Sequence, residues 1–118
     1  MSVAFVSVLG SPRTASLSPT DTSDHTLIDV GSLGSALLQV IIANNTGSAA
    51  TATVAWHDGS TDWDIYAAKS ISANDTLIAE LFIRLPENGA IKVASGTANA
   101  LTFTVTIADY VGQVGGRV

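Results

Sequence analysis

Residues 101–107 constrain the fold more than any other part of the sequence. Four apolar side chains alternate there with three threonines; the apolar ones are Leu101, Phe103, Val105 and Ile107. Successive side chains of a β-strand point to opposite faces of a sheet, so this pattern predicts a strand with one buried and one solvated face. Residues 51–57 repeat the pattern, with Ala52, Val54 and Trp56 on the predicted buried face. The sequence therefore predicts a protein built from β-strands.

Other segments extend this prediction. Residues 37–43 carry apolar side chains on both faces, with Leu38, Val40 and Ile42 predicted on one and Leu37 and Ile41 on the other. A strand covered on both faces is typical of the centre of a sheet or of a subunit contact. Shorter or weaker patterns predict strands at 3–9, 26–30, 63–68, 77–83 and 91–94. Residues 77–85 also fit a helix, because their apolar side chains include pairs four positions apart.

Turn-forming residues separate these segments, at 44–47, 58–60, 72–75, 86–89 and 96–99. Asn, Asp and Gly tolerate the positive φ that such turns require. About eight short strands, with turns every 8–12 residues or so, are typical of an antiparallel two-sheet sandwich, either jelly-roll or immunoglobulin-like. We expect an N-terminal strand or arm and a Ser/Thr/Pro-rich loop over 1–25, with 11–23 extended or looped. The β-sandwich domain follows over 26–111 and a Gly-rich tail over 112–118.

Composition bears on the partners. Only 13% of residues are charged, against about 25% in an average soluble domain, and 47% are hydrophobic. A surface with so few charges predicts that another chain covers part of it. The net charge of −5, with five scattered cations, argues against nucleic acid as a partner. No apolar stretch approaches the ~20 residues of a membrane-spanning helix, so no membrane partner is expected.

Candidate chemical sites are few. A zinc site needs three or four ligands, and the chain has only His25, His57 and no cysteine. Asp58, Asp62 and Asp64 fall in one turn region and form a weak calcium candidate, because calcium prefers clustered carboxylate oxygens. Aspartates are also common in turns for backbone reasons. The sequence contains no Gly-x-Ser-x-Gly nucleophile elbow and no phosphate-binding glycine loop, so we expect no enzyme activity and no cofactor.

Aromatic residues surround the same turn. Trp56, Trp63 and Tyr66 lie beside its aspartates, as rings lie beside acidic groups in carbohydrate-binding sites. Trp56, however, continues the buried face of Ala52 and Val54. Trp63 and Tyr66 are an odd number of positions apart, which places them on opposite faces of a regular strand. Core packing is therefore favoured, and a carbohydrate- or host-surface-binding module is kept as the alternative function.

Five segments suggest a family: 39–47 (QVIIANNTG), 53–58 (TVAWHD), 71–77 (ISANDTL), 88–93 (NGAIKV) and 98–101 (ANAL). In strand–turn rhythm and Ala/Thr/Gly content, residues 28–110 resemble small virion structural proteins of tailed bacteriophages. The resemblance implies that each chain forms one β-sandwich and that many copies of the chain assemble as a homo-oligomer. It would decorate or cement the capsid, or else serve in the neck or tail. The implied location is the virion, and the implied partners are copies of itself and the major capsid protein or head–tail and tail components.

The two ends of the chain carry apolar side chains with few neighbours in sequence that could bury them. An arm such as residues 3–9 can add a strand to the sheet edge of a neighbouring subunit. Strand addition also covers an edge that would otherwise aggregate. We therefore predict assembly contacts at six residues, namely Val3, Phe5, Val6, Val8, Val111 and Val114.

Overall fold

The computed structural model describes the backbone of residues 5–115 and the side chains of residues 8–111. All regular structure in this part of the chain is β-strand. The strands are β1 (Phe5–Leu17), β2 (His25–Asp29), β3 (Ser35–Asn44), β4 (Ala50–His57), β5 (Asp62–Ile71), β6 (Thr76–Leu85), β7 (Ala90–Ser95) and β8 (Leu101–Gly115). The helix considered for residues 77–85 is therefore wrong: they form β6, whose side chains alternate regularly between exposed and half-buried.

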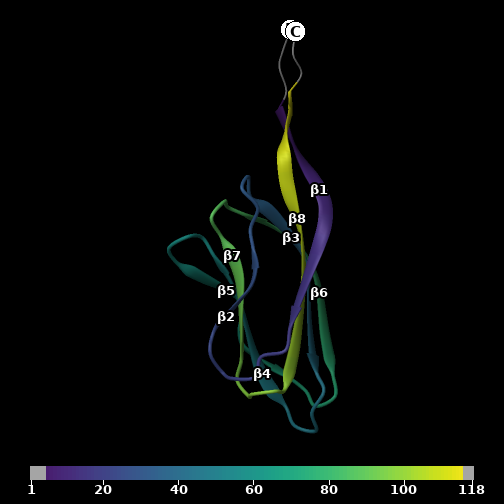
Figure 1. Ribbon diagram of the computed structural model, residues 1–118. Coiled ribbons are helices and arrows are strands. Elements are labelled where there is room, and N and C mark those ends of the chain that lie inside the picture. The colour runs from purple at the N-terminus through teal and green to yellow at the C-terminus, as the bar shows by residue number, and fades with distance from the viewer. Residues whose placement is uncertain (1–4, 116–118) are drawn as a thin grey trace.

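The strands form two antiparallel sheets that face each other (Figure 1). Sheet A has the order β1–β8–β3–β6 and sheet B the order β2–β7–β4–β5. Only β4 and β5 form a hairpin within one sheet, while every other described connection crosses between the sheets. This wrapping of eight strands into two four-stranded sheets is the jelly roll. The predicted all-β two-sheet sandwich is confirmed, in its jelly-roll form.

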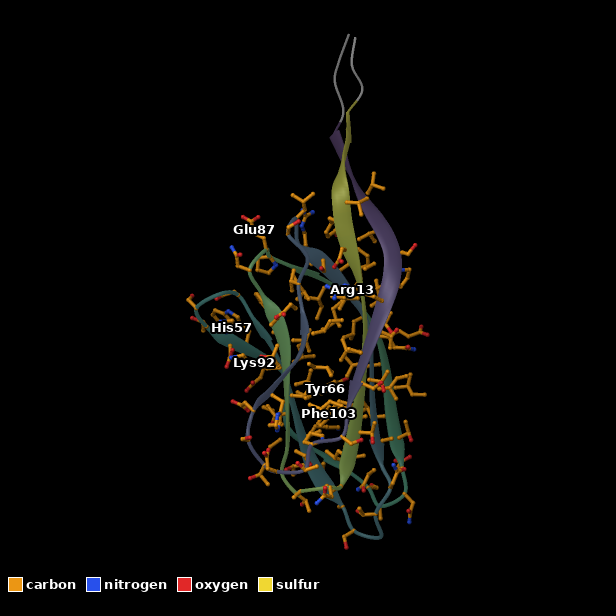
Figure 2. All side chains as sticks on the ribbon, viewed as in Figure 1. Arg13, His57, Tyr66, Glu87, Lys92 and Phe103 are labelled. Carbon is orange, nitrogen blue, oxygen red and sulfur yellow. The ribbon has the colours of Figure 1, made fainter. Side chains whose placement is uncertain are left out.

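The core lies between the sheets, where Figure 2 places Phe103. The inward-facing side chains of the two central strands of sheet A, β3 and β8, are fully buried, as are those of β4 and β7 opposite them. Of the residues predicted to be buried, Val40, Ile42, Val54, Phe103, Val105 and Ile107 are 0% exposed. Trp56 is only half-buried and packs against the edge of this cluster. Period-two alternation thus identified these six core residues correctly but overstated the burial of Trp56.

A bulge in β3 corrects the predicted faces of residues 37–43. Leu37 is fully buried with Val40 and Ile42, while Leu38 is only half-buried. The pairing of β3 shifts between Leu37 and Gln39 on both sides, against β6 and against β8. An extra residue in a strand reverses the face of every side chain on one side of it. Leu37 therefore joins the core, although it is an odd number of residues from Val40.

The Ser/Thr/Pro-rich segment, expected to be extended or looped, is extended in its first half. Residues 11–17 are not a loop but part of β1, which pairs antiparallel with β8 as far as Leu17↔Phe103. Hydroxyl groups hold the two strands together across the outer face of sheet A. The pairs are Thr14–Thr106 (3.0 Å), Ser16–Thr104 (2.9 Å) and, just beyond β1, Ser18–Thr102 (2.7 Å). Small hydroxyl side chains suit a strand when the neighbouring strand offers threonines.

Turns were predicted well. Asn74, Asn88 and Asn99, in three of the predicted turns, have φ between 54° and 64°. Asn44, at the end of β3, is buried and has its side chain fully hydrogen-bonded. Its Nδ2 group donates to the carbonyls of Ser48 and Ile71, and its Oδ1 atom accepts from the amide and the hydroxyl of Thr46. One side chain therefore joins β3, the β3–β4 turn and the end of β5.

The molecule is elongated, with extents of 62 × 26 × 18 Å. Figure 1 shows why: β1 and β8 continue together past the end of the sandwich as a two-stranded ribbon. We define this terminal ribbon as residues 5–9 and 110–115, which pair from Phe5↔Gly115 to Leu9↔Tyr110. The structure contains no helix, within the residues it describes, that is long and apolar enough to cross a membrane.

Candidate functional site

Five of the six predicted assembly residues lie in the terminal ribbon. The backbones of Phe5, Val6 and Val8 pair with those of Gly115, Val114 and Gly112. Val111 is 62% exposed and lies against Gly10, where a Cβ atom would stand 2.8 Å from its Cγ1 atom. Val3 lies outside the described residues. The two arms thus pair with each other within one chain, and whether the six residues contact other subunits stays a prediction.

A charged cluster holds the base of the ribbon to the sandwich. The Arg13 guanidinium on β1 donates to both carboxylate oxygens of Asp109 on β8, at 3.0 and 3.1 Å, and also to the Asp29 carbonyl at the end of β2. The hydroxyl of Ser35, 2.6 Å away, donates to Asp109 as well, while it accepts from the Gly31 amide. Arg13 first, and then Ser35, hold the pKa of Asp109 below its ordinary value, against the effect of burial. These contacts tie β1 and β8 to the β2–β3 loop.

The β4–β5 turn contains the aromatic pair considered for sugar binding. The Trp56 and Trp63 rings stack with centroids 6.1 Å apart, and Trp63 is 51% exposed. Asp58 accepts hydrogen bonds from Trp63 Nε1 (3.0 Å) and from the amides of Ser60 and Thr61. These bonds, Trp63 first, lower the pKa of Asp58. Asp58 therefore acts as an anchor of the turn and of the Trp63 ring.

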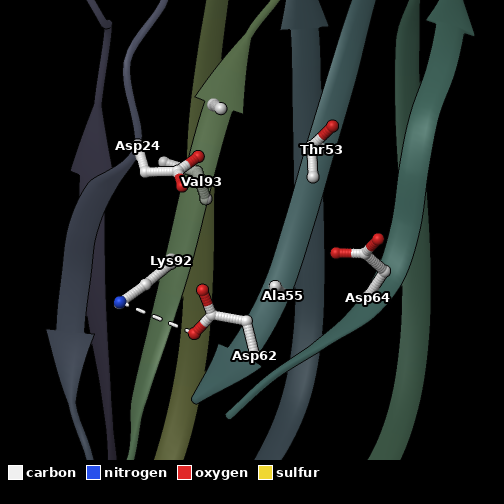
Figure 3. Close-up of a pocket in the computed structure, with 8 residues that line it drawn as sticks. Asp24, Thr53, Ala55, Asp62, Asp64, Lys92 and Val93 are labelled. Atoms are coloured by element: carbon white, nitrogen blue, oxygen red, sulfur yellow. Dashed lines mark ion pairs between the residues drawn. The ribbon is translucent and has the colours of Figure 1, made fainter.

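The three aspartates of the calcium candidate do not converge. Asp62 and Asp64 line a pocket of about 80 Å³ on the outer face of sheet B, with Asp24 and Lys92, and Asp58 is not among the lining residues (Figure 3). Within the residues that the structure describes, no group of three or more His, Cys, Asp or Glu could hold a metal. Ligand pockets usually measure about 300–1,000 Å³, so this hollow is too small for a typical small-molecule site.

Asp62 is already engaged inside this pocket. Its Oδ1 atom lies 2.6 Å from His57 Nδ1 and 3.5 Å from Lys92 Nζ. The bond from His57 first, and then Lys92, hold the pKa of Asp62 below its ordinary value. His25, the other histidine, pairs with Asp21 at 2.7 Å in the β1–β2 loop. Each histidine therefore bonds an aspartate of its own neighbourhood, and the two do not share a site.

Sequence analysis missed one surface, the outward-facing side of β6. Ile78 and Phe82 are 62% and 65% exposed there, and they alternate with Glu80 and Arg84. The sequence pattern that predicts this surface is the one used for residues 37–43, namely apolar side chains on both faces of a strand. In β6 one apolar face packs against the core, while the other remains largely exposed among the side chains that the structure describes.

Comparisons with known proteins place the fold. No protein-family model and no curated protein matches the sequence. The structure is similar to a chain of the acid-stable capsid of the Helicobacter pylori bacteriophage KHP30, with a TM-score of 0.65 and 10% identity over 99% of this chain and 100% of that one. It is also similar to a chain of infectious bursal disease virus, Gx strain, with a TM-score of 0.51 and 7% identity over 96% of this chain and 35% of that one.

T=1 particles derived from infectious bursal disease virus give a TM-score of 0.51 and 6% identity, over 96% of this chain and 34% of that one. Identities this low show a shared fold and nothing finer. The jelly roll described above is therefore a fold that this chain shares with chains of phage and viral particles.

Proposed function

We propose that this chain is a non-enzymatic structural component of a bacteriophage virion, and that it decorates or cements the capsid of a tailed phage. One observation carries the proposal: the likeness to a chain of a phage capsid structure runs over 99% of this chain and 100% of that one. That protein therefore consists of one such sandwich. A position in the neck or tail is the alternative within the same class.

The surface supports a role in an assembly. Over residues 8–111, whose side chains the structure describes, five large apolar side chains are more than half exposed: Leu33, Trp63, Ile78, Phe82 and Val111. They stand on a chain with only 13% charged residues. A protein that binds in many linked copies needs only modest affinity at each contact, because the copies act together. Separate apolar contacts on a sparsely charged surface meet this requirement.

The terminal ribbon supports it as well. It extends past the end of the sandwich and contains five of the six predicted assembly residues, namely Phe5, Val6, Val8, Val111 and Val114 (Figure 1). We propose that the ribbon as a whole, and not two separate arms, contacts the major capsid protein or a neighbouring copy. The proposal involves no nucleic acid, membrane or cofactor.

The composition of purified virions tests the proposed function. Phage particles produced from the genome that encodes this chain should contain it, as measured by quantitative mass spectrometry. A decoration or cement protein should reach a copy number comparable with that of the major capsid protein, whereas a neck or tail protein should be present in far fewer copies. Particles that lack the chain altogether would refute the proposal.

A truncation tests the ribbon. Deleting residues 1–9 removes the pairing partners of 110–115 but leaves the sandwich, so the isolated domain should unfold at nearly the same temperature. Attachment to the phage particle should weaken, and Lys69→Ala, a change of an exposed side chain on β5, should leave it unchanged. If the truncated protein no longer folds, β1 is needed as a whole for sheet A and the ribbon is not a separable contact.

A carbohydrate-binding role is the second candidate, favoured by the orientation of Trp63. Its ring is half-exposed, stacked on Trp56 and held by Asp58, so it is rigid and accessible. The jelly roll also occurs in lectin domains. A ligand that binds the native state raises its melting temperature. We expect no shift with candidate glycans, calcium or EDTA; a glycan shift that Trp63→Ala abolishes would favour the second candidate instead.

A further inference from the structure

The four edge strands of the sandwich differ in how they discourage pairing with another chain. Natural proteins protect edges by short strands, bulges, proline and lysine. β1 contains Gly10 and Pro12 and two register shifts, and β2 has only five residues and one shift. β5 contains Lys69 and two register shifts. β6 has ten residues without glycine, proline or lysine, and one register shift, where Leu81 and Phe82 together face the single residue Leu38 of β3.

Apolar surface is also left uncovered at β6. Phe82 and Ile78 are at least as exposed as any other large apolar side chain that the structure describes. Leu81 and Ile83, on the inner face of β6, are only half-buried although they pack against the core. A further strand beside β6 would cover both sets.

The charges on β6 indicate which strand this is. Three successive outward-facing residues are Glu80, Phe82 and Arg84. Within the side chains that the structure describes, neither Glu80 nor Arg84 forms an ion pair. If a second β6 runs antiparallel with a two-fold axis at Phe82, each Glu80 lies opposite an Arg84 and the two phenylalanines face each other. Opposite charges and aromatic pairs directly across strands are stabilising.

We infer that β6 pairs antiparallel with β6 of a second copy of this chain, about a two-fold axis at Phe82. A two-fold contact uses the same surface on both copies, so its residues must be self-complementary, as Glu80, Phe82 and Arg84 are. On the inner side, the same register places each Leu81 opposite an Ile83 of the other copy. Contact between them would bury these half-buried side chains of both copies further. The two copies of sheet A become one continuous eight-stranded sheet.

Arg84 is already held in a suitable place. Its guanidinium lies over the Tyr110 ring, with Cζ 4.4 Å from the ring centroid, which keeps it on the outer face of sheet A. Stacking on an aromatic face leaves the N–H groups at the rim of the guanidinium directed outward in its plane. They can donate to a carboxylate that arrives from a neighbouring strand.

Other two-fold registers match less well. An axis at Glu80 would bring Ile78 opposite Phe82 but would also place the two Glu80 carboxylates directly opposite each other, which is destabilising. An axis at Leu81 would pair Glu80 with Phe82 and Ile78 with Arg84, so that no charge meets its opposite. Only the axis at Phe82 satisfies both charges. The inference rests on these contacts alone and does not depend on the proposed virion role.

Sedimentation equilibrium of the full chain tests the pairing. The wild-type protein should dimerise reversibly, and Phe82→Glu, which places two carboxylates at the axis, should abolish the dimer. Phe82 is largely exposed, so the melting temperature of the dilute monomer should stay unchanged. Leu33→Glu is the matched control, because Leu33 is also an exposed apolar residue (53%) but lies in the β2–β3 loop, and it should leave the dimer intact.

Charge reversal tests the register. Glu80→Arg should weaken the dimer by roughly threefold to thirtyfold, the effect of two cross-strand charge pairs. Arg84→Glu should weaken it at least as much, since the stacking on Tyr110 is lost too. The double variant Glu80→Arg/Arg84→Glu should bind more tightly than Arg84→Glu alone, because each pair is restored with its signs exchanged.

Three results would overturn the inference. A dimer that Glu80→Gln strengthens has its axis at Glu80. A dimer that survives Phe82→Glu uses another surface. A wild-type chain that stays monomeric at every concentration, while Phe82→Glu abolishes its attachment to phage particles, assigns β6 to a different virion protein.

Discussion

Sheet A has two edge strands, β1 and β6, and they differ in their outward-facing side chains and in their contacts with the rest of the chain. β1 is joined to β8 by two hydroxyl pairs, with a third just beyond its end, and by the ion pair between Arg13 and Asp109. Thr14 and Ser16, on its outer face, are polar and small. β6 has the same kind of inner face, but its outward-facing side chains include Ile78 and Phe82. One edge is therefore completed by its own chain, whereas the other presents apolar surface.

This difference teaches that stability and assembly use different residues of one sheet. The polar contacts of β1 hold the fold, so changing them should alter unfolding. The exposed apolar residues of β6 contribute little to the fold of a single chain, because they lose little water-accessible area when it folds. Four predictions test the contrast, each by chemical denaturation of the dilute, monomeric protein.

The largest effect is expected in the core that lies beneath both edges. Phe103 is fully buried between the sheets, so Phe103→Ala removes a ring from a close-packed site and leaves a cavity. The free energy of unfolding should fall by about 3–5 kcal/mol. A loss below about 1 kcal/mol would mean that Phe103 is not packed as described, and the sandwich core would need revision.

Asn44 should follow in magnitude. Asn44→Ala removes four hydrogen bonds and leaves the Ile71 carbonyl without its donor in a buried site. We expect the free energy of unfolding to fall by about 2–4 kcal/mol. The matched control is Asn45→Ala, at the exposed neighbouring position, which should change it by less than about 0.5 kcal/mol. Equal effects at the two positions would contradict the role given to Asn44.

The ion pair at the β1 edge should make an acid-dependent contribution to the free energy of unfolding. The pKa of Asp109 is lowered in the folded protein, chiefly by Arg13, so its ionised form adds stability above the unfolded pKa of about 4. This stability is lost as the pH falls through the folded pKa. Both side chains are partly exposed, so the contribution is at most about 1 kcal/mol. Asp109→Asn should show a flatter decline in unfolding free energy between about pH 5 and pH 2 than the wild type.

The smallest effect on the free energy of unfolding is expected at the β6 edge. Phe82→Ala should change the free energy of unfolding of the monomer by no more than about 0.5 kcal/mol, because the side chain is largely exposed. The same substitution should nevertheless weaken dimerisation. A loss of stability comparable with that of Phe103→Ala would erase the distinction between the two residues.

Local patterns in the sequence predicted much of this fold. Alternation identified the buried face of β8, and turn residues such as Asn74 and Asn88 marked where strands end. These features depend on near neighbours, which a single sequence displays. The reversal of faces at Leu38 could not be predicted in this way, because a bulge arises from pairing with strands far along the chain. The strand over 11–17 could not be assigned from local pattern either. Its serines and threonine suit a loop as well as a strand, and the strand follows only from its pairing with β8.

The candidate surfaces were predicted less completely. The apolar ends were recognised, but not that they pair with each other, since strand partners more than a hundred residues apart leave no local signal. Trp56 was assigned to the core because it continues the pattern of Val54, yet its position at the hairpin end leaves it half-buried and stacked on Trp63. Edge position, which also governs the exposure of Phe82, follows from the order of strands in the sheet.

The pairing of β1 with β8 has a consequence for synthesis of the protein. Arg13 and Asp109, which meet across these strands, are 96 residues apart in sequence. Long-range pairings of this kind slow folding, and this one cannot form on the ribosome before β8 has emerged. β1 must therefore wait, unpaired, for β8. A nascent chain can assemble β2 to β7 earlier, so the edge of β3 that later receives β8 is where a chaperone would be most useful.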